Sequence, residues 1–203
     1  MSEPLVGVLA LQGDVREHRH ALGSLGCEAV AVRTPEALDG VDALVLPGGE
    51  STAISHLLVT SGLEAPLAAR LRDGMPAFGT CAGLVLLASG ITDGRDDQHA
   101  MGLLDVEVRR NGYGRQVASF EGSCELRGRG RIPAVFIRAP RITRVGADVE
   151  VLATIDVGDG AHPVLVRQGS VLGASFHPEL TDDRTVHGLF LELAAASRAV
   201  KPL

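Results

Sequence analysis

A short apolar segment that turns at once into an apolar helix, with a cysteine at the turn, constrains this chain most. Residues 75–78 predict a buried strand, residues 82–88 predict a helix, and Cys81 lies between them. Gly79 and Gly83 flank the cysteine at a spacing that leaves room for a sharp strand-to-helix turn, here called the elbow. The first free N–H groups of the helix then favour a thiolate over a thiol at the turn. We therefore predict that Cys81 is a nucleophile.

A second segment, Ser175 to Leu180, offers the groups that such a nucleophile needs. Pro178 disfavours the helical conformation for the residue before it. We therefore expect an extended stretch in which His177 and Glu179 point to the same side. His177 can then act as the base for the thiol and Glu179 can orient the imidazole ring, as in a catalytic triad.

A glycine pair lies in a third segment, between a predicted strand at residues 43–46 and a predicted helix. Gly48 and Gly49 let backbone N–H groups approach a ligand closely, and the helix start that follows favours negative charge. We expect this loop to help form an oxyanion hole. A glycine pair alone more often marks an ordinary strand-to-helix turn, so this prediction depends on the elbow and on the histidine segment.

Short apolar strands alternate with helices over the first hundred residues. Strands are expected at 5–11, 28–33, 43–46 and 75–78. Three helices are expected between them: one begins at Asp14, one ends near Thr60 and one spans 63–73. The tetrapeptide Asp14-Val-Arg-Glu17 resembles a capping box with Asp14 as the N-cap. Further strands, many of them antiparallel, are expected at 103–109, 134–137, 149–154, 163–167 and 171–175. A closing helix is expected at 183–199. The pattern predicts an α/β fold: a mostly parallel sheet flanked by helices, with additional antiparallel strands in the second half and functional loops at the strands' carboxyl ends.

Composition narrows the class further. The chain has 203 residues, 45% of them hydrophobic, and no evident linker, so we expect a single domain over residues 1–203. Aromatic residues make up only 3%, so the core must consist of Val, Leu, Ile and Ala, which suits parallel strands buried on both faces. The net charge of −6 argues against nucleic acid as a partner. Arginines between Arg109 and Arg144 have acidic residues among them and are expected on a solvated or partner-facing surface.

Several classes of protein are disfavoured by what the sequence lacks. The three cysteines form no C-x-x-C pair, which favours a reducing cytoplasm. The apolar run at 5–11 is too short for a signal-peptide core or a membrane span, so a cytoplasmic protein without a membrane partner is expected. No dinucleotide-binding glycine motif follows the first strand, and there is no Walker-type lysine loop or metal-ligand spacing, so we expect no cofactor and no metal.

Other reactive side chains have simpler interpretations. Cys27 and Cys124 are expected to be small core residues. Surface or helix-face positions are expected for the remaining histidines, His18, His20, His56, His99, His162 and His187. Residues 93–98 are expected to form an exposed loop, and neither this loop nor Tyr113 has an assigned role.

Six segments, in this order, resemble the family of glutaminase subunits of pyridoxal 5′-phosphate synthase: Gly7-Val-Leu-Ala-Leu-Gln-Gly-Asp-Val-Arg-Glu-His18, Leu46-Pro-Gly-Gly-Glu-Ser-Thr52, Gly79-Thr-Cys-Ala-Gly83, Arg110-Asn-Gly-Tyr-Gly-Arg-Gln116, Phe136-Ile-Arg-Ala-Pro140 and Ser175-Phe-His-Pro-Glu-Leu-Thr181. These subunits are class I glutamine amidotransferases with a flavodoxin-like fold. The elbow and the histidine segment alone would indicate only that wider class, and the other segments narrow it. The departure is small: Gly112-Tyr113 stands where relatives often have a polar residue and phenylalanine.

The resemblance implies a role for each matching residue. Cys81 would attack the side-chain amide of L-glutamine, with His177 as base and then acid, and with Glu179 orienting His177. The glutamine pocket would be lined by Gly48, Gly49, Glu50, Ser51, Arg110, Ile137 and Arg138. The N–H groups of Gly49 and Ala82 would be the oxyanion donors, and Gln12 would lie near them at the face that meets the synthase subunit.

The implied reaction converts L-glutamine and water to L-glutamate and ammonia through a γ-glutamyl thioester on Cys81. The ammonia would pass to the synthase subunit within a large hetero-oligomer. We expect the free subunit to be slow until docking orders the region of Gln12, Gly48 and Gly49. Two alternatives stay open: an amidotransferase subunit of another pathway or a γ-glutamyl hydrolase, and a non-catalytic regulatory binding module on the same fold.

Overall fold

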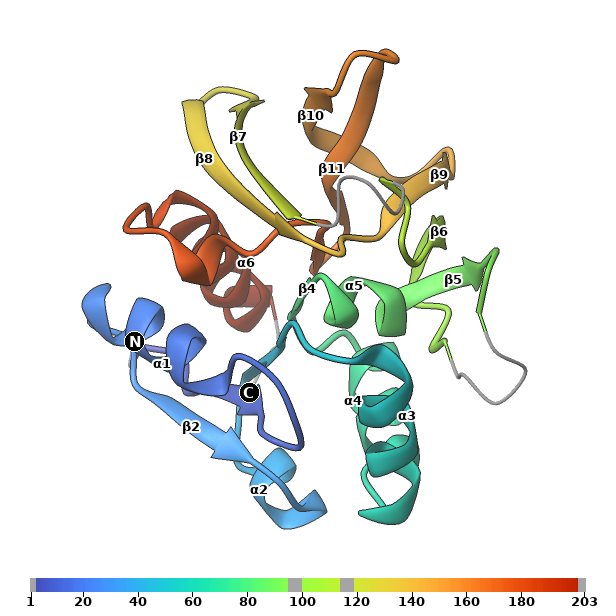
Figure 1. The fold of residues 1–203 in the computed structure, drawn as a ribbon. Helices are drawn as coiled ribbons and strands as arrows, with labels where there is room; N and C mark the ends of the chain where they lie inside the picture. Colours follow the sequence, from blue (N-terminus) through green and yellow to red (C-terminus); the bar gives the residue numbers. More distant parts are fainter. Residues whose placement is uncertain (1–2, 95–99, 114–118, 201–203) are drawn as a thin grey trace.

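Five parallel strands form the centre of the fold (Figure 1). In the computed structural model, which describes residues 3–94, 100–113 and 119–200, these strands are β1 (Val6–Leu9), β2 (Ala29–Val32), β3 (Ala43–Leu46), β4 (Ala77–Thr80) and β12 (Val171–Ala174). They lie side by side in the order β2-β1-β3-β4-β12, and every neighbouring pair is parallel. This is the strand order of the flavodoxin-like doubly wound fold.

Antiparallel strands extend this sheet beyond β12 and form a second, smaller sheet. The large sheet continues through β11 (Ala161–Gln168), β10 (Glu150–Asp156), β7 (Ser119–Leu126) and β8 (Gly130–Ile137). The smaller sheet consists of β5 (Ala88–Ile91), β6 (Leu104–Arg109) and β9 (Arg141–Val145). The fold class predicted from the sequence, a mostly parallel sheet flanked by helices with antiparallel strands in the second half, is confirmed.

Helices cover both faces of the parallel strands. One face packs against α2 (Pro35–Asp39), α3 (Ser51–Thr60), α4 (Glu64–Arg72) and α5 (Ala82–Leu87), and the other against α1 (Val15–Ser24) and α6 (Thr185–Val200). Successive side chains of a strand point to opposite faces, and β3 follows this rule. Leu44 and Leu46 belong to the apolar cluster on the side of α2 to α5, whereas Ala43 and Val45 belong to the cluster on the side of α1 and α6. Burial on both faces explains why these strands have continuous apolar sequences.

The predicted elements are mostly confirmed, with corrections at particular positions. The strand that leads into the elbow, expected at 75–78, instead spans Ala77–Thr80. The short helix α2 and the strands β5, β7 and β9 were not expected from the sequence. The predicted capping box is wrong, because the Asp14 side chain makes no capping hydrogen bond to α1. Of the exposed loop expected at 93–98, Asp93 and Gly94 are exposed and the rest lies outside the described residues.

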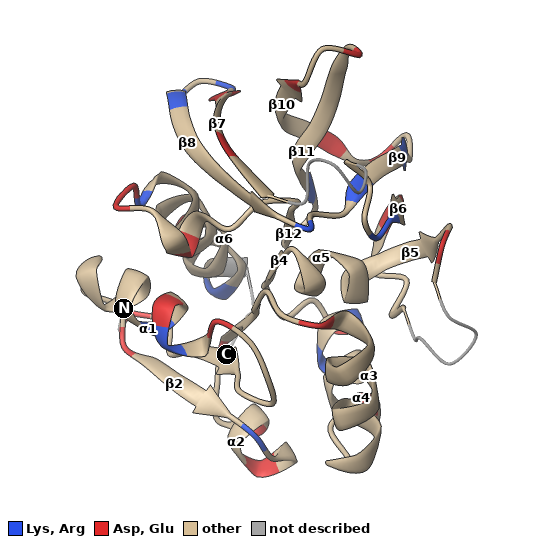
Figure 2. Ribbon diagram, in the orientation of Figure 1, with Lys and Arg blue, Asp and Glu red and all other residues tan. Residues whose placement is uncertain are grey.

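Several arginines of the second half pair with neighbouring carboxylates. Figure 2 shows acidic and basic segments close together on β6 and β9, where Arg144 lies 2.7 Å from Asp105 and 2.9 Å from Glu107. Arg141 likewise lies 2.9 Å from Asp159. Within the described ranges, the structure contains no helix that combines the length and the hydrophobicity needed to cross a bilayer.

The elbow depends on a close approach between α5 and β3. A Cβ atom on Gly83 would overlap the carbonyl oxygen of Leu46 and lie 2.8 Å from its carbonyl carbon. A Cβ atom on Gly79 would lie 2.6 Å from the carbonyl oxygen of Gly83. Both obstacles are backbone atoms, which cannot move aside as a side chain can. Glycine at these two positions therefore allows the helix to begin directly after β4.

We expect Gly83→Ala to destabilise the protein by about 1–3 kcal/mol, because the added methyl group forces α5 away from β3. Gly188→Ala on α6 is the matched control, since a Cβ atom there meets nothing within 4 Å. That control should be neutral or stabilising by up to about 1 kcal/mol, because alanine is the better helix former. Urea unfolding of the two variants measures the difference, and equal stabilities would contradict this account of the elbow.

Candidate functional site

Cys81 has a backbone conformation that few residues other than glycine adopt. Its φ is 48° and its ψ is −101°, between the end of β4 and the start of α5. Its N–H donates to the carbonyl of Ala174 at 2.8 Å, which holds the turn against the end of β12. The side chain is buried, and its Sγ lies 3.9 Å from the carbonyl oxygen of Ile137. Strained backbone of this kind gathers at functional sites, where the surrounding structure holds it in place.

His177 and Glu179 meet beside Cys81. The Nδ1 atom of His177 lies 2.8 Å from Oε1 of Glu179, and both residues are buried. The expected contact is present, but the expected extended stretch is wrong: Pro178–Leu180 form a turn of 3₁₀ helix, η1. His177, with φ −107° and ψ 85°, avoids a helical conformation, as a residue before proline should. The tight turn, and not strand alternation, brings the carboxylate back to the imidazole.

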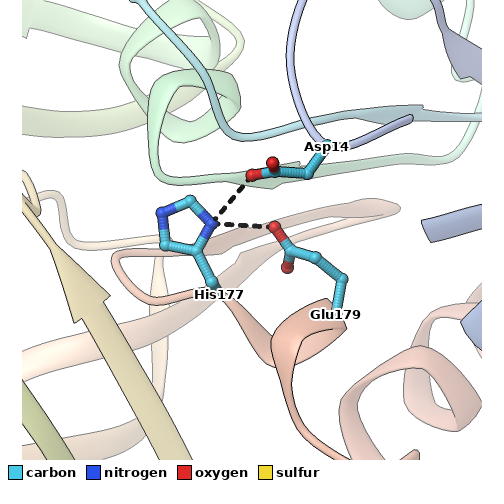
Figure 3. Close-up of side chains that lie close together, drawn as sticks. All are labelled: Asp14, His177 and Glu179. Carbon is cyan, nitrogen blue, oxygen red and sulfur yellow. Dashed lines mark hydrogen bonds and ion pairs between the residues drawn. The ribbon is translucent and has the colours of Figure 1, made fainter. Parts of the chain in front are cut away.

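Asp14 supplies a second carboxylate to the same ring nitrogen, which sequence reasoning missed. Figure 3 shows Asp14 and Glu179 approaching His177 from different elements, and Asp14 Oδ2 lies 3.3 Å from Nδ1. Asp14 sits between β1 and α1, where its N–H donates to the carbonyl of Gly48 at 3.1 Å. The sequence does contain a signal, the aspartate at the start of α1, but the capping-box pattern predicts a helix cap for that side chain and not a contact with His177.

These neighbours control protonation at the site. Burial by itself lowers the pKa of His177, but hydrogen bonds to Asp14, Cys81 and Glu179, together with the charge of Glu179, raise it well above its ordinary value. Burial by itself raises the pKa of Glu179, and the rings of His18 and His177 outweigh that effect, so this pKa lies below its ordinary value. The imidazole therefore holds a proton readily beside an ionised carboxylate, which favours proton transfer from a thiol.

Gly48 makes room for the imidazole. A Cβ atom on this residue would overlap Cε1 of His177 and lie 2.7 Å from Nδ1 and 3.0 Å from Asp14 Oδ2. The structure thus places Gly48 against the ring of His177 and outside the lining of the cavity described below. Any larger residue at this position would displace the ring from its two carboxylates.

Glu50 and Gln12 fix the rest of the glycine loop. Glu50 is the N-cap of α3 and accepts hydrogen bonds from the N–H groups of Thr52 and Ala53 at 3.1 and 2.7 Å. Its own N–H donates to the side-chain oxygen of Gln12 at 2.8 Å. Arg110 lies 3.1 Å from Glu50 Oε1. Burial alone raises the pKa of Glu50, but the two backbone N–H groups and Arg110 hold it below its ordinary value.

A cavity of about 320 Å³ brings the predicted residues together. Its lining includes the predicted site residues Gln12, Gly49, Glu50, Ser51, Cys81, Ala82, Arg110, Ile137, Arg138 and His177. Glu179 lies behind His177 and does not line the cavity. Arg138 shares with Cys81 a positive φ, here 44°, which is unusual for a residue other than glycine. Lining residues that the sequence did not single out are Asp14, Val85, Asn111, Pro140 and Leu180.

Two histidines expected at surface or helix-face positions lie on helices α1 and α6 but are fully buried. His18 and His187 have no exposed side-chain surface, and His18 Nε2 lies 3.4 Å from Glu179 Oε1. The helix-face alternative therefore holds for both residues and the surface alternative does not, while His20 and His56 are exposed. His162 is partly buried against Asp159, and His99 lies outside the described residues. The helical pattern of α1 does distinguish the two residues. Val15, Ala21 and Leu22 lie on the same helix face as His18, whereas Arg16, Glu17 and Ser24 share the face of His20.

The remaining side chains behave as core residues. Cys27 and Cys124 are buried, as predicted, and burial raises the pKa of Cys124 to about 11. Tyr113 packs against Phe120 and Phe136 with ring centroids 5.6 Å apart in each pair.

The group Asp14, His177 and Glu179 brings three potential metal-ligand atoms within 4.8 Å of one another. The Nδ1 atom of His177 faces two carboxylates, which makes it a hydrogen-bond donor with no lone pair for a metal ion. These three side chains therefore form a hydrogen-bonded cluster around the imidazole ring of His177.

The fold and this site define a class: an α/β protein of the glutamine amidotransferase type, with a cysteine at the elbow and a histidine–glutamate pair after the neighbouring parallel strand. A solved structure described as a glutamine amidotransferase superposes with a TM-score of 0.87, at 52% identity over 94% of this chain and 98% of that chain. PurLQS from Thermotoga maritima shares the fold alone, with a TM-score of 0.65 at 19% identity.

The sequence model of the SNO glutamine amidotransferase family matches residues 8–196. The chain belongs to this family. A relative from Rhodococcus opacus (strain B4), named pyridoxal 5′-phosphate synthase subunit PdxT, is 56% identical over 198 residues, which cover 95% of this chain and 98% of the relative. A relative of the same name from Streptomyces avermitilis is 52% identical over 205 aligned positions, which cover 100% of this chain and 100% of the relative.

The raised pKa of His177 predicts a pH dependence of stability. A folded-state pKa above the unfolded value of 6.5 contributes stability that is fully present below pH 6.5 and is lost as the pH rises above it. The stability advantage of wild type over His177→Gln should therefore shrink between pH 6.5 and 9, by at most about 1.4 kcal/mol per pH unit. Urea unfolding under reducing conditions measures it, with the exposed His56→Gln reporting the background. A constant advantage would show that the ring is not held protonated.

Proposed function

We propose that this chain is a glutaminase that hydrolyses L-glutamine to L-glutamate and ammonia and delivers the ammonia to a synthase subunit for pyridoxal 5′-phosphate biosynthesis. The observation that carries the proposal is the strained Cys81 beside the His177–Glu179 pair, at one cavity, in a chain that is 50–58% identical to relatives named for that synthase. No cofactor takes part in the proposed reaction.

The chemistry follows from the position of each group. His177 holds the proton that the Cys81 thiol gives up, and the sulfur forms a bond to the amide carbon of the substrate side chain. The N–H groups of Gly49 and Ala82 are the proposed donors to the resulting oxyanion, and each such donor is commonly worth about 10²–10³ in rate. His177 then protonates the nitrogen, the C–N bond breaks and ammonia leaves. Water, deprotonated by His177, attacks the γ-glutamyl thioester and releases glutamate and the thiol.

The rest of the cavity suits a zwitterionic amino acid. Arg110 offers a guanidinium that matches a carboxylate, and Glu50 offers a carboxylate that matches an ammonium group. These two side chains form an ion pair of 3.1 Å across the lining, so each can exchange its partner for one end of the substrate. Ser51, Ile137 and Arg138 complete the proposed pocket for glutamine.

We propose that docking of the synthase subunit, in a large hetero-oligomer in the cytoplasm, completes the oxyanion hole. Gln12 accepts the N–H of Glu50 and so holds the loop that carries Gly49. A Cβ atom on Gly49 would lie 3.1 Å from the side-chain amide carbon of Gln12, which shows how tightly the two segments meet. A partner that contacts the exposed Gln12 can therefore set the orientation of the Gly49 peptide.

The alternatives are less well supported. Relatives that match nearly the whole chain bear the synthase-subunit name, whereas an amidotransferase subunit of another pathway or a γ-glutamyl hydrolase would match different relatives. A non-catalytic module on the same fold would not need a strained cysteine beside an ionised histidine–carboxylate pair.

Ammonia release from L-glutamine is the direct test, measured with the purified chain alone and with its synthase subunit. We expect Cys81→Ala to lower the rate by about 10³-fold or more, because the covalent step is lost. Cys124→Ala is the matched control, since that thiol is buried with its pKa raised to about 11, and it should retain activity. Activity that needs Cys81 but ignores the synthase would refute the pathway, and no activity in either case would refute the glutaminase.

Removal of the Gln12 side chain should separate basal from stimulated turnover. We expect Gln12→Ala to reduce the stimulation by the synthase subunit about tenfold or more. Complete loss of one oxyanion donor lowers kcat by about 10²–10³-fold, and a poorly held donor loses part of that effect. Alkylation of Cys81 by a small electrophile should be unchanged, since Gln12 does not touch the thiol. Full stimulation of the variant in a binding-saturated assay would rule out this role.

A further inference from the structure

A pair of buried histidines lies next to Glu179, outside the cavity. His18 and His187 are fully buried, and His18 Nδ1 lies 3.1 Å from His187 Nε2. The other ring nitrogen of His18, Nε2, lies 3.1 Å from Thr80 Oγ1 and 3.4 Å from Glu179 Oε1. Neither histidine lines the site cavity, and the mechanism described above uses neither.

His18 links three elements beside the site: α1, β4 and η1. It lies on α1 one turn after Asp14, and its N–H donates to the carbonyl of Asp14 at 3.2 Å. Thr80 is the last residue of β4, immediately before Cys81. Glu179 belongs to η1, next to His177. One imidazole ring therefore touches the strand before the nucleophile and the carboxylate behind the base.

The hydrogen-bond partners decide where the protons lie. Burial lowers the pKa of His187 to about 3, so this ring is neutral and carries a single proton. Its Nδ1 atom has no partner among the described residues. A buried N–H without a partner is rarer and costlier than a buried acceptor without one. The proton of His187 therefore lies on Nε2 and is donated to Nδ1 of His18.

This arrangement fixes the tautomer of His18. Because its Nδ1 atom accepts a hydrogen bond, its own proton lies on Nε2, which faces Thr80 Oγ1 and Glu179 Oε1. Glu179 Oε1 then faces His18 Nε2 at 3.4 Å and His177 Nδ1 at 2.8 Å, while Oε2 has no partner in the described part of the chain. A single carboxylate oxygen thus faces both rings. His177 gains and loses a proton during the proposed reaction, whereas His18 takes part in no step of it.

We propose that His18 is a positioning residue for this site: an imidazole, its tautomer fixed by His187, that donates its Nε2–H to Glu179 and Thr80 and so holds the carboxylate aligned on His177. The kinetic part of this inference rests on the proposed glutaminase function, and the tautomer does not. Other titratable or charged groups around this cluster are Asp14, Glu17, Cys81 and Arg184.

Two variants and a control test the proposal kinetically. His18→Leu removes the donor, whereas His18→Gln keeps an amide N–H near the position of Nε2. The exposed His20→Leu, on the same helix, is the matched control. We expect His18→Leu to move the acid limb of the kcat/KM profile for ammonia release upward by about one pH unit, with KM nearly unchanged, because Glu179 loses a donor to its anion. His18→Gln should restore most of the wild-type profile.

Imidazole nitrogen NMR of the wild-type protein tests the tautomer without any activity. We expect neutral rings with the proton on Nε2 for both His18 and His187. A doubly protonated His18, or a proton on its Nδ1, would overturn the proposal, as would an unchanged acid limb in folded His18→Leu. If His18→Leu does not fold, the NMR spectrum and the profile of His18→Gln decide. If wild type releases no ammonia, the proposed function fails, and the spectrum together with the pH dependence of Cys81 alkylation still tests His18.

Discussion

The close contact between α5 and β3 at Gly83 is the constraint on which the rest of the site depends. It lets the helix begin one residue after Cys81 and holds that residue at φ 48°. Because β4 lies between β3 and β12, the carboxyl end of β4 meets the loops that leave both neighbours. The glycine loop after β3 and the histidine segment after β12 therefore reach the thiol from opposite sides, as expected at strand ends in a doubly wound sheet.

The first helix has an equally important role on the other side of the sheet. It begins at the carboxyl end of β1 and carries Asp14 and His18 on successive turns, so both face the segment that contains His177 and Glu179. A buried carboxylate is tolerated only when donors surround it. The rings of His177 and His18 supply those donors, and α6 adds His187 behind them. The ionised state of the site thus depends on helices from both ends of the chain.

The sequence predicted elements best where apolar periodicity was strong and local. The strand at 43–46 was predicted at its observed bounds, because it is apolar throughout and buried on both faces. The strand β7 was missed, since glycine, serine and glutamate interrupt its apolar residues and pairing with β8 stabilises it. Helix α2 has five residues, too few for a helical period to stand out. Asp14 was placed correctly at a helix start, but its side chain serves His177 because the tertiary contact outcompetes the local cap.

The sequence by itself determined the parallel α/β architecture, the elbow cysteine, the histidine–glutamate pair and the glycine loop. Each of these has a local signature, either apolar alternation or a fixed spacing of glycine, proline and reactive residues. Only the tertiary structure decided that His177 has two carboxylates and that His18 and His187, separated by 169 positions, share a hydrogen bond inside the core. Such contacts form when distant helices pack on the same face of a sheet, and no neighbouring residues in the sequence record which side chains will then meet.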